Sequence, residues 1–325
     1  MDEMNRNVSS YRHIPGIDKP VSRVVLGTMV INTRQKEDSF ALLDAAYEYG
    51  INTFDTAAVY AGGDSERGIG MWCAERGLRE QIVILDKGCH HNRDRKRVTP
   101  YDLAADVHDA LARLQTDYID LYMLHRDDPS LPVGPIVEAL NEHLVEGRIR
   151  AYGVSNWTLD RIKEAIRYAE AYGLTPIAVN SPNYGLAEQV ENPWGPGCVS
   201  LSGPEHKADR AWHVERQMPV FAYSSLGRGL FSGRITRDNY RDVADSACQR
   251  AYCHEVNFQR LDRATEMARQ KGISVAQLAL AYVLNSPMAT FALVGAANRQ
   301  EIEQCVAAQN IKLSEAELAW LESGS

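Results

Sequence analysis

Short apolar runs alternate along the chain with longer segments in which apolar side chains recur every three or four residues. Residues 24–28 form one such run and are rich in β-branched side chains, which predicts a strand. Residues 38–49 show helical spacing, and Gly50 then ends the predicted helix. Further strands are predicted near Asn52, Ile82 and Ile119 and over residues 149–154, 177–180, 220–224 and 290–294. Further helices are predicted over residues 65–76, 100–114, 135–146, 158–172, 257–271, 274–285, 299–309 and 314–321.

This alternation predicts the fold class. Eight strand–helix units with short connections are typical of an α/β fold, the (β/α)8 or TIM barrel, and they favour it over an open sheet. No linker is evident, so we expect a single domain over residues 1–325. Pro15-Gly16 signals a turn within residues 11–20, which predicts an N-terminal hairpin that plugs one end of the barrel.

Residues 181–217 interrupt the alternation with a long irregular stretch that contains several prolines and glycines. A connection of this length inside a compact domain is usually functional or disordered. Its aromatic and apolar content favours an ordered loop over the C-terminal mouth of the barrel. Trp194 in this stretch is expected to contact the substrate, although the same side chain could instead anchor the loop to the barrel wall.

Composition narrows the classes of function. The formal net charge is −8 and no long basic block is present, which argues against nucleic acid as a partner. The six cysteines form no CxxC pair, as expected for reduced thiols in an intracellular protein. Residues 1–10 lack an apolar signal core, and no apolar run approaches the ~18 residues that span a bilayer. We therefore expect a soluble cytoplasmic protein with no membrane partner.

Four side chains with proton chemistry follow three successive predicted strands, namely Asp55 and Tyr60, then Lys87, then His125. In a parallel barrel the C-terminal ends of the strands meet at one mouth, so these groups should lie together. A phenol with a pKa near 10 donates a proton more easily beside a cation such as Lys87, which Asp55 would hold charged. His125 would donate a hydrogen bond to a substrate carbonyl. Because none of the four is an obvious nucleophile, the attacking group is expected to be a hydride from a cofactor.

Each of these residues also has a structural explanation, such as a helix cap, wall packing or a salt bridge at the barrel end. Their joint occurrence on consecutive strand ends favours the catalytic interpretation. A metal site using Asp55, His91 and His125 is disfavoured, because the neighbouring residues of Cys89-His90-His91 would point to opposite sides and no HxH motif lies on an early strand. The glycine-rich segment 227–233 does not have the GxGxxG spacing of a dinucleotide-binding fold.

Several segments, taken in order, resemble the aldo-keto reductase superfamily, and in particular its branch of bacterial reductases and potassium-channel β subunits. These segments are residues 52–60, 87–88, 124–126, 153–156, 222–227 and 294–296. The resemblance implies a (β/α)8 barrel that binds an extended nicotinamide dinucleotide without a Rossmann domain. It also implies a catalytic tetrad of Asp55, Tyr60, Lys87 and His125, with Tyr60 as the general acid in carbonyl reduction.

The same resemblance implies the cofactor contacts. Ser155 and Asn156 would hold the nicotinamide carboxamide, and Tyr223 would stack on the ring. The full set of implied cofactor contacts is Gly27, Thr28, Asp55, Ser155, Asn156, Ser181, Tyr223, Ser224, Leu226, Gly227, Arg228, Arg234, Gly295, Arg299, Glu301 and Gln304. The expected substrate contacts are Tyr60, His125, Trp157 and Trp194.

The sequence departs from the family pattern at the carboxamide and adenosine ends. Ser181 stands where the family has glutamine, and Glu301 would repel a 2′-phosphate or accept a bond from a free ribose hydroxyl. Arg234 and Arg299 could offset that charge. The resemblance therefore favours NADP(H), with NAD(H) as the alternative.

The predicted function is the NAD(P)H-dependent, reversible reduction of a small aldehyde or ketone to an alcohol, the chemistry of an oxidoreductase acting on CH–OH donors. The alternative is a cofactor-binding regulatory protein that senses redox state with little turnover. The intact tetrad favours the enzyme. Nothing in the sequence indicates the natural substrate, the physiological direction or the oligomeric state.

Overall fold

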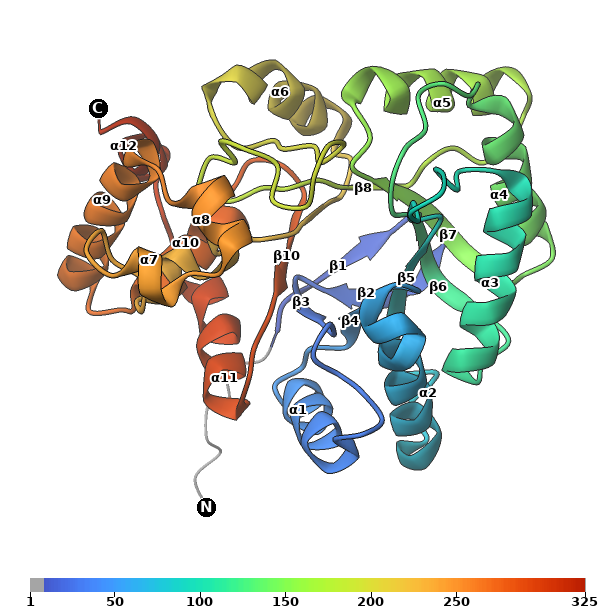
Figure 1. Ribbon diagram of the computed structural model, residues 1–325, viewed down its shortest axis with the longest axis horizontal. Helices are drawn as coiled ribbons and strands as arrows, with labels where there is room; N and C mark the ends of the chain where they lie inside the picture. Colours follow the sequence, from blue (N-terminus) through green and yellow to red (C-terminus); the bar gives the residue numbers. More distant parts are fainter. Residues whose placement is uncertain (1–8, 325) are drawn as a thin grey trace.

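The computed structural model describes residues 9–324, in which eight parallel strands close into a barrel (Figure 1). The barrel closes where the first and last of these strands pair, with Val24 opposite Ala292. The strands, in their order around the barrel, are β10 (Thr290–Val294), β3 (Val24–Gly27), β4 (Thr53–Asp55), β5 (Val83–Gly88), β6 (Ile119–Leu124), β7 (Ile149–Ser155), β8 (Val179–Ser181) and β9 (Val220–Ala222). The predicted (β/α)8 barrel is thus confirmed. The absence of an export signal was argued on residues 1–10, of which 1–8 lie outside the described residues.

Helices surround the strands, with α3, α4 and α5 on one side and α9, α10 and α12 on the opposite side (Figure 1). The long helices are α1 (Lys36–Glu48), α2 (Asp64–Arg76), α3 (Pro100–Leu114), α4 (Gly134–Val145), α5 (Leu159–Ala171), α6 (Lys207–Arg216), α9 (Glu255–Lys271), α10 (Val275–Leu284), α11 (Arg299–Ala307) and α12 (Glu315–Ser323). The short ones are η1 (Tyr60–Gly63), η2 (Pro204–His206), η3 (Gly227–Ser232), α7 (Tyr240–Val243), α8 (Ser246–Tyr252) and η4 (Ala308–Asn310). Local signals set their starts: Thr99 caps α3 ahead of Pro100, and Ser274 and Gln277 form a capping box on α10. Within residues 9–324, no helix has the length and apolar character needed to cross a membrane.

Alternate residues of each strand face two separate cores. Val83 and Leu85 on β5 belong to the cluster inside the barrel, whereas Ile84 belongs to the larger cluster between the strands and the helices. Phe221 and Phe291 stack inside the barrel with ring centroids 4.5 Å apart. Because the side-chain period of a strand is two residues, the inward-facing set continues to residues at the C-terminal strand ends.

The predicted N-terminal hairpin is present as β1 (Tyr11–Ile14) paired antiparallel with β2 (Ile17–Ser22). Ile14, Ile17 and Val21 pack with the side chains inside the barrel, so the hairpin closes the barrel at the end opposite the strand C-termini. The turn requires Gly16, which has φ +85° and whose added Cβ would lie 2.8 Å from the Arg150 carbonyl oxygen.

The segment predicted as an irregular loop, residues 181–217, contains helix α6 and the turn η2. The prediction missed α6, a ten-residue helix of which only His213 is buried, while Trp212 and Val214 are partly buried against the core. The first part of the segment remains irregular and lies at the mouth, where its Val199 N–H donates to the Asn156 side chain.

Candidate active site

Three of the four predicted catalytic side chains are joined at the C-terminal ends of β4 and β5. The Lys87 ammonium forms an ion pair of 2.6 Å with Asp55 and donates to the Tyr60 hydroxyl at 3.3 Å and to the Thr56 carbonyl at 2.9 Å. Asp55 and Lys87 are almost completely buried, and Tyr60 opens the 3₁₀ turn η1 beyond β4. The inward alternation of β4 and β5 places both charged residues inside the mouth.

Burial and the ion pair determine the protonation states of this group. Burial raises the pKa of Tyr60 above its usual value of 10, and the Lys87 charge opposes that rise. Burial acts to lower the pKa of Lys87, but Asp55 and Tyr60 raise it above its usual value overall. At neutral pH, Tyr60 therefore carries its proton while Lys87 is charged beside it. A phenol poised next to a cation in this way can release its proton to a developing alkoxide.

His125 follows β6 and completes the group. Its ring packs edge-on against Tyr60, with the ring centroids 5.9 Å apart. Burial and the neighbouring Lys87 charge hold the pKa of His125 well below its usual 6.5, so the imidazole is neutral at physiological pH. Its Nδ1 is buried and has no hydrogen-bond partner among residues 9–324. A neutral imidazole in this position can donate an N–H to a substrate oxygen without adding charge to the site.

Asp86 lies directly behind the tetrad, on the outward-facing side of β5. It is fully buried, and neither of its carboxyl oxygens meets a hydrogen-bond donor within the described part of the chain. The adjacent acid Glu66, also fully buried, is paired with Arg113 at 3.0 Å. Burial first, and then the negative charge of Glu66, raise the pKa of Asp86 well above its usual 3.8. Both causes favour the protonated, uncharged form of Asp86 over its carboxylate.

Asp86→Asn is therefore expected to alter how stability depends on pH. The folded-state pKa of Asp86 lies above the unfolded one, so its stabilising contribution is largest at low pH and is lost as pH rises. Asparagine mimics the protonated acid and cannot ionise. The variant should match the parent near pH 3.5, below the ordinary aspartate pKa, and exceed its free energy of unfolding by about 1–3 kcal/mol near pH 8, the usual cost of a buried unsatisfied group. Urea unfolding at both pH values measures this, with the exposed Glu303→Gln as control. A difference that does not change with pH would contradict the assignment.

The residues predicted to hold the nicotinamide end of a cofactor lie together beside His125. The Asn156 amide oxygen accepts hydrogen bonds from the Tyr223 hydroxyl at 2.7 Å and from the Val199 N–H at 3.1 Å. Its amide nitrogen donates to the His125 carbonyl at 3.3 Å. Ser155 donates to the Ser181 carbonyl at 2.7 Å. These bonds fix the side chains of this wall before any ligand binds.

Backbone strain is concentrated in the loops around the mouth. Non-glycine residues with positive φ occur here at Ala61 (50°), Cys89 (57°), Asn156 (61°), Ser224 (54°) and Arg228 (55°). Such residues are uncommon, and each costs of order 1 kcal/mol, so the surrounding packing must enforce them. Strain of this kind is typical of functional sites.

The residues predicted to meet the phosphates lie in and after η3. Arg228 is paired with Asp245 at 3.0 Å and lies over the Trp194 ring at 5.2 Å from its centroid. Arg234 is exposed and forms no ion pair with any residue of the described range. Gly295 faces open space, since a Cβ added there would meet no atom within 4 Å. Cations and open backbone at one rim suit an extended anionic cofactor, so the residues present fit a nicotinamide dinucleotide.

Other predicted cofactor contacts surround this rim. Gly27 ends β3, and the fully buried Thr28 donates to the Asp55 carbonyl at 2.9 Å. Ser224 and Leu226 are half-buried at the start of the turn that leads to Gly227. Trp194 lies close to the cofactor wall, with its ring centroid 5.8 Å from that of Tyr223, and it is 40% exposed.

Three predicted contacts, Trp157, Arg299 and Glu301, are buried in the outer core or engaged with other residues. Trp157 is 1% exposed in the outer core, and its indole N–H donates to the Arg126 carbonyl at 3.2 Å, so it has no free face for a substrate. Arg299 is paired with Glu48 at 2.5 Å. Glu301 accepts from the Ala297 N–H at 2.9 Å, within the first turn of α11. Gln304 is half-buried one turn further on.

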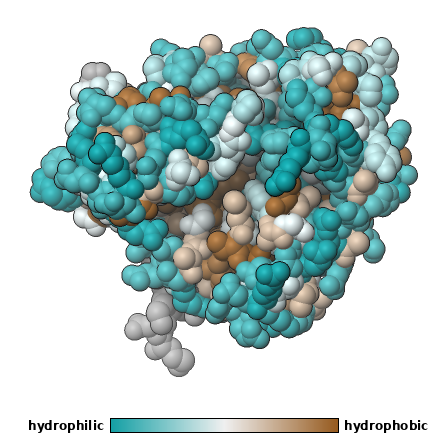
Figure 2. All heavy atoms as spheres, in the orientation of Figure 1, coloured by the Kyte–Doolittle hydropathy of each residue, from teal (hydrophilic) through white to brown (hydrophobic). Residues whose placement is uncertain are grey.

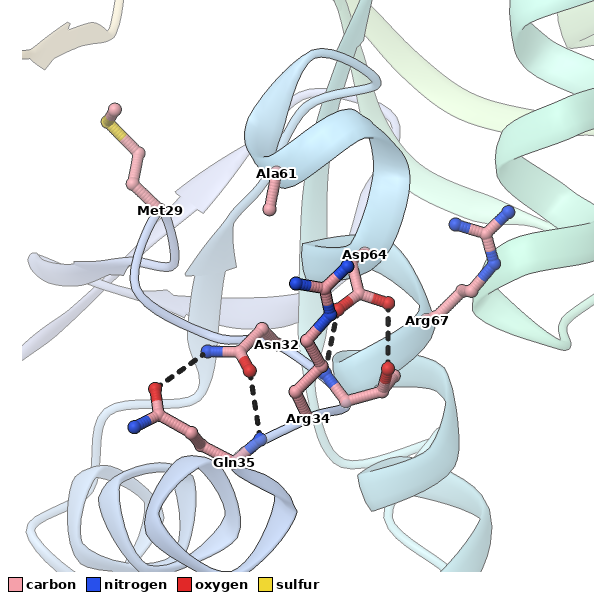
Figure 3. Close-up of a pocket in the computed structure, with 8 residues that line it drawn as sticks. Met29, Asn32, Arg34, Gln35, Ala61, Asp64 and Arg67 are labelled. Atoms are coloured by element: carbon pink, nitrogen blue, oxygen red, sulfur yellow. Dashed lines mark hydrogen bonds between the residues drawn. The ribbon is translucent and has the colours of Figure 1, made fainter.

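A cavity of about 710 Å³ opens between the β3–α1 loop, η1 and the first turn of α2 (Figure 3). Thr33 donates to Asp64 at this rim through both its N–H (2.9 Å) and its hydroxyl (2.8 Å). The residues that line the cavity are Met29, Asn32, Thr33, Arg34, Gln35, Ala61, Asp64 and Arg67. Figure 2, drawn in the orientation of Figure 1, shows apolar surface within a hollow in the middle of this face of the molecule. The sequence pattern did not reveal this cavity, because its lining comes from a loop and from η1 and the start of α2, which lie about 30 residues further along the chain.

Arg126 and His90 were not among the predicted site residues, although both lie next to His125. Arg126 is only 6% exposed although it follows directly on His125. The His90 ring packs edge-on against that of His125, with centroids 4.9 Å apart. The sequence signal that could have identified Arg126 is its position just after the end of a predicted strand. In the sequence it served only as part of the segment 124–126 that resembles the family.

Comparisons with known proteins agree with this geometry. The profile of the Aldo/keto reductase family matches residues 23–324. Protein tas of Escherichia coli is 28% identical, with 96% of each chain covered, and a norsolorinic acid reductase of Aspergillus flavus is 30% identical over 92% of this chain and 76% of its own. An aldo-keto reductase from Klebsiella pneumoniae, solved in complex with NADPH, is 29% identical with a TM-score of 0.72 over 97% of this chain and 94% of that one. The glycerol dehydrogenase of Gluconobacter oxydans is 25% identical with a TM-score of 0.78 over 98% and 95%. With its barrel, its tetrad and a family match over nearly its whole length, this chain belongs to the aldo/keto reductase family.

Proposed function

We propose that this protein catalyses the reversible, NADPH-dependent reduction of an aldehyde or ketone to an alcohol. The observation that carries the proposal is the buried chain from Asp55 through Lys87 to the Tyr60 hydroxyl. A regulatory protein that only bound a cofactor would have no need for a protonated phenol held against a charged amine inside a binding mouth.

The side chains divide the chemistry among them. Tyr60 gives its proton to the substrate oxygen in reduction and takes it back in alcohol oxidation. Lys87 stabilises the phenolate that remains, and Asp55 keeps the lysine charged and in place. The neutral His125 orients the carbonyl by donating a hydrogen bond to its oxygen. The nicotinamide cofactor, when bound, supplies the hydride.

The proposed preference for NADP(H) over NAD(H) has two supports. Two structures of aldo-keto reductase from Klebsiella pneumoniae contain the phosphorylated cofactor, one as NADPH and one as NADP with acetate. In this chain, Arg234 is an exposed cation near the phosphate rim that lacks an ion-pair partner among residues 9–324. A 2′-phosphate would supply that partner, whereas a free ribose hydroxyl would not.

The test follows the absorbance of NADPH at 340 nm in the presence of aldehydes and ketones. We expect turnover with NADPH, and a kcat/KM for NADPH at least about 10-fold above that for NADH, as one charge-assisted contact would give. Titration of cofactor binding by protein fluorescence serves as an independent measurement. Cofactor binding without turnover on any carbonyl would contradict the proposed function and favour a redox-sensing role.

A further inference from the structure

We propose that the carbonyl substrate of this enzyme carries a carboxylate and that Arg126 binds it. The inference rests on the proposed function and adds to it the chemical class of the substrate. It begins from a buried cation beside the catalytic histidine for which the fold supplies no acidic partner.

Arg126 has no counter-ion in the protein. Its side chain is almost fully buried, yet no carboxylate of residues 9–324 lies within 4 Å of its guanidinium. The two acids that follow it in sequence are paired elsewhere: Asp127 with Arg161 at 3.1 Å, and Asp128 with Lys96 at 2.9 Å. A buried charge without a partner is costly, so it persists where function uses it.

The guanidinium is also under-used as a hydrogen-bond donor. Nη1 donates to the Gly197 carbonyl at 3.1 Å and to the Cys198 sulfur at 3.2 Å. Nε is buried and has no partner within the described range, and Nη2 takes part in none of the hydrogen bonds found there. Nε and Nη2 form the edge of the guanidinium that binds carboxylates through two parallel hydrogen bonds.

The position of Arg126 points to the substrate more than to the cofactor. It follows directly on His125, which contacts Tyr60, and its partners Gly197 and Cys198 adjoin Val199 on the wall built around Asn156. The cations expected at the phosphates, Arg228 and Arg234, instead follow β9. A substrate with its carbonyl at His125 would therefore extend its remaining groups toward Arg126.

The balance of charges at the mouth also favours a substrate that carries a carboxylate. Lys87 is neutralised by Asp55, and burial holds the pKa values of His90, His91 and His125 below 6.5, with the Arg126 charge adding to the effect in each case. Arg126 is thus left as an uncompensated positive charge next to neutral imidazoles. In a partly desolvated mouth, such a charge favours an anionic ligand over a neutral one.

The experiment pairs oxo acids with their methyl esters. The acids are 4-oxobutanoate, 5-oxopentanoate and 2-, 3- and 4-formylbenzoate, so that the span between carbonyl and carboxylate varies. We expect the parent enzyme to prefer at least one acid over its ester by about 10- to 100-fold in kcat/KM, as a charge-assisted pair would give. In Arg126→Gln that preference should vanish, while kcat/KM for the esters stays within about threefold. Arg126→Lys keeps the charge but not the two-pronged geometry, and should retain part of the preference.

Arg93→Gln is the matched control, since it removes one exposed arginine from the β5–α3 loop and should leave the preference unchanged. Competitive inhibition of the parent enzyme by benzoate, but not by benzamide, supports the inference without any variant. Equal loss on acids and esters in Arg126→Gln, with a lowered Tm, would show that Arg126 only fixes the 195–199 loop. Turnover of esters without preference for any acid would overturn the inference and leave the proposed function standing. If the enzyme reduces none of the acids and none of the esters, both the carboxylate inference and the proposed function are contradicted.

Discussion

Replacement of Tyr60 by phenylalanine is expected to lower kcat for carbonyl reduction by about 10²- to 10⁴-fold, the usual contribution of a general acid. The change keeps the ring that packs against His125 and removes only the hydroxyl that accepts from Lys87. The substrate oxygen then lacks its proton donor. Single-turnover measurement of NADPH oxidation under saturating substrate isolates this step from product release.

Two controls make the Tyr60 result specific. The dissociation constant for NADPH should stay within about twofold, because the hydroxyl is not among the proposed cofactor contacts. Tyr101→Phe removes a phenol that is 80% exposed on α3 and should leave kcat unchanged. Turnover within a few-fold of the parent enzyme would exclude Tyr60 as the proton donor.

Lys87→Met should have an effect of similar size with a distinct pH signature. The Lys87 charge opposes the burial that raises the pKa of Tyr60, so its loss raises that pKa further. Carbonyl reduction needs the protonated phenol. The alkaline limb of the pH–rate profile should therefore move to higher pH for any residual turnover. The same change leaves Asp55 buried without its partner, which typically destabilises a protein by about 3–5 kcal/mol.

The double variant Asp55→Asn with Lys87→Met separates these two effects. It removes both charges, so most of the stability should return while turnover stays low. Thermal unfolding and kcat are measured on the same preparations. Recovery of turnover together with stability, or an unchanged alkaline limb in Lys87→Met, would mean that the lysine acts only through the fold.

The sequence predicted the barrel and the tetrad because both follow from the period of the strands. Once a run such as residues 83–88 is recognised as a strand, alternation sends Lys87 inward, and parallel packing brings it to Asp55. The hairpin was equally predictable, because Pro15-Gly16 combines a rigid residue with one that tolerates positive φ.

The features that were missed depend on contacts between distant segments. Helix α6 is short, fully buries only His213, and follows a stretch rich in proline and glycine that is typical of a loop. The environment of Asp86 is set by Glu66 on α2, and that of Arg126 by Gly197 and Cys198 on the long loop. Trp157 was expected at the substrate, yet it turns into the outer core. Local periodicity carries no information on such pairings.

The closing seam of the barrel has a consequence for how the chain folds. β3 pairs with β10, which lies nearly the whole length of the chain away, so the ring cannot close until the last strand has been synthesised. Until then β3 and β9 each keep an unpaired edge, and open edges invite pairing with other chains. Folding should consequently be slow, because most of its strand contacts are non-local. A ribosome-bound chain that stalls before β10 would be a species prone to aggregate, which makes chaperone protection most valuable late in synthesis.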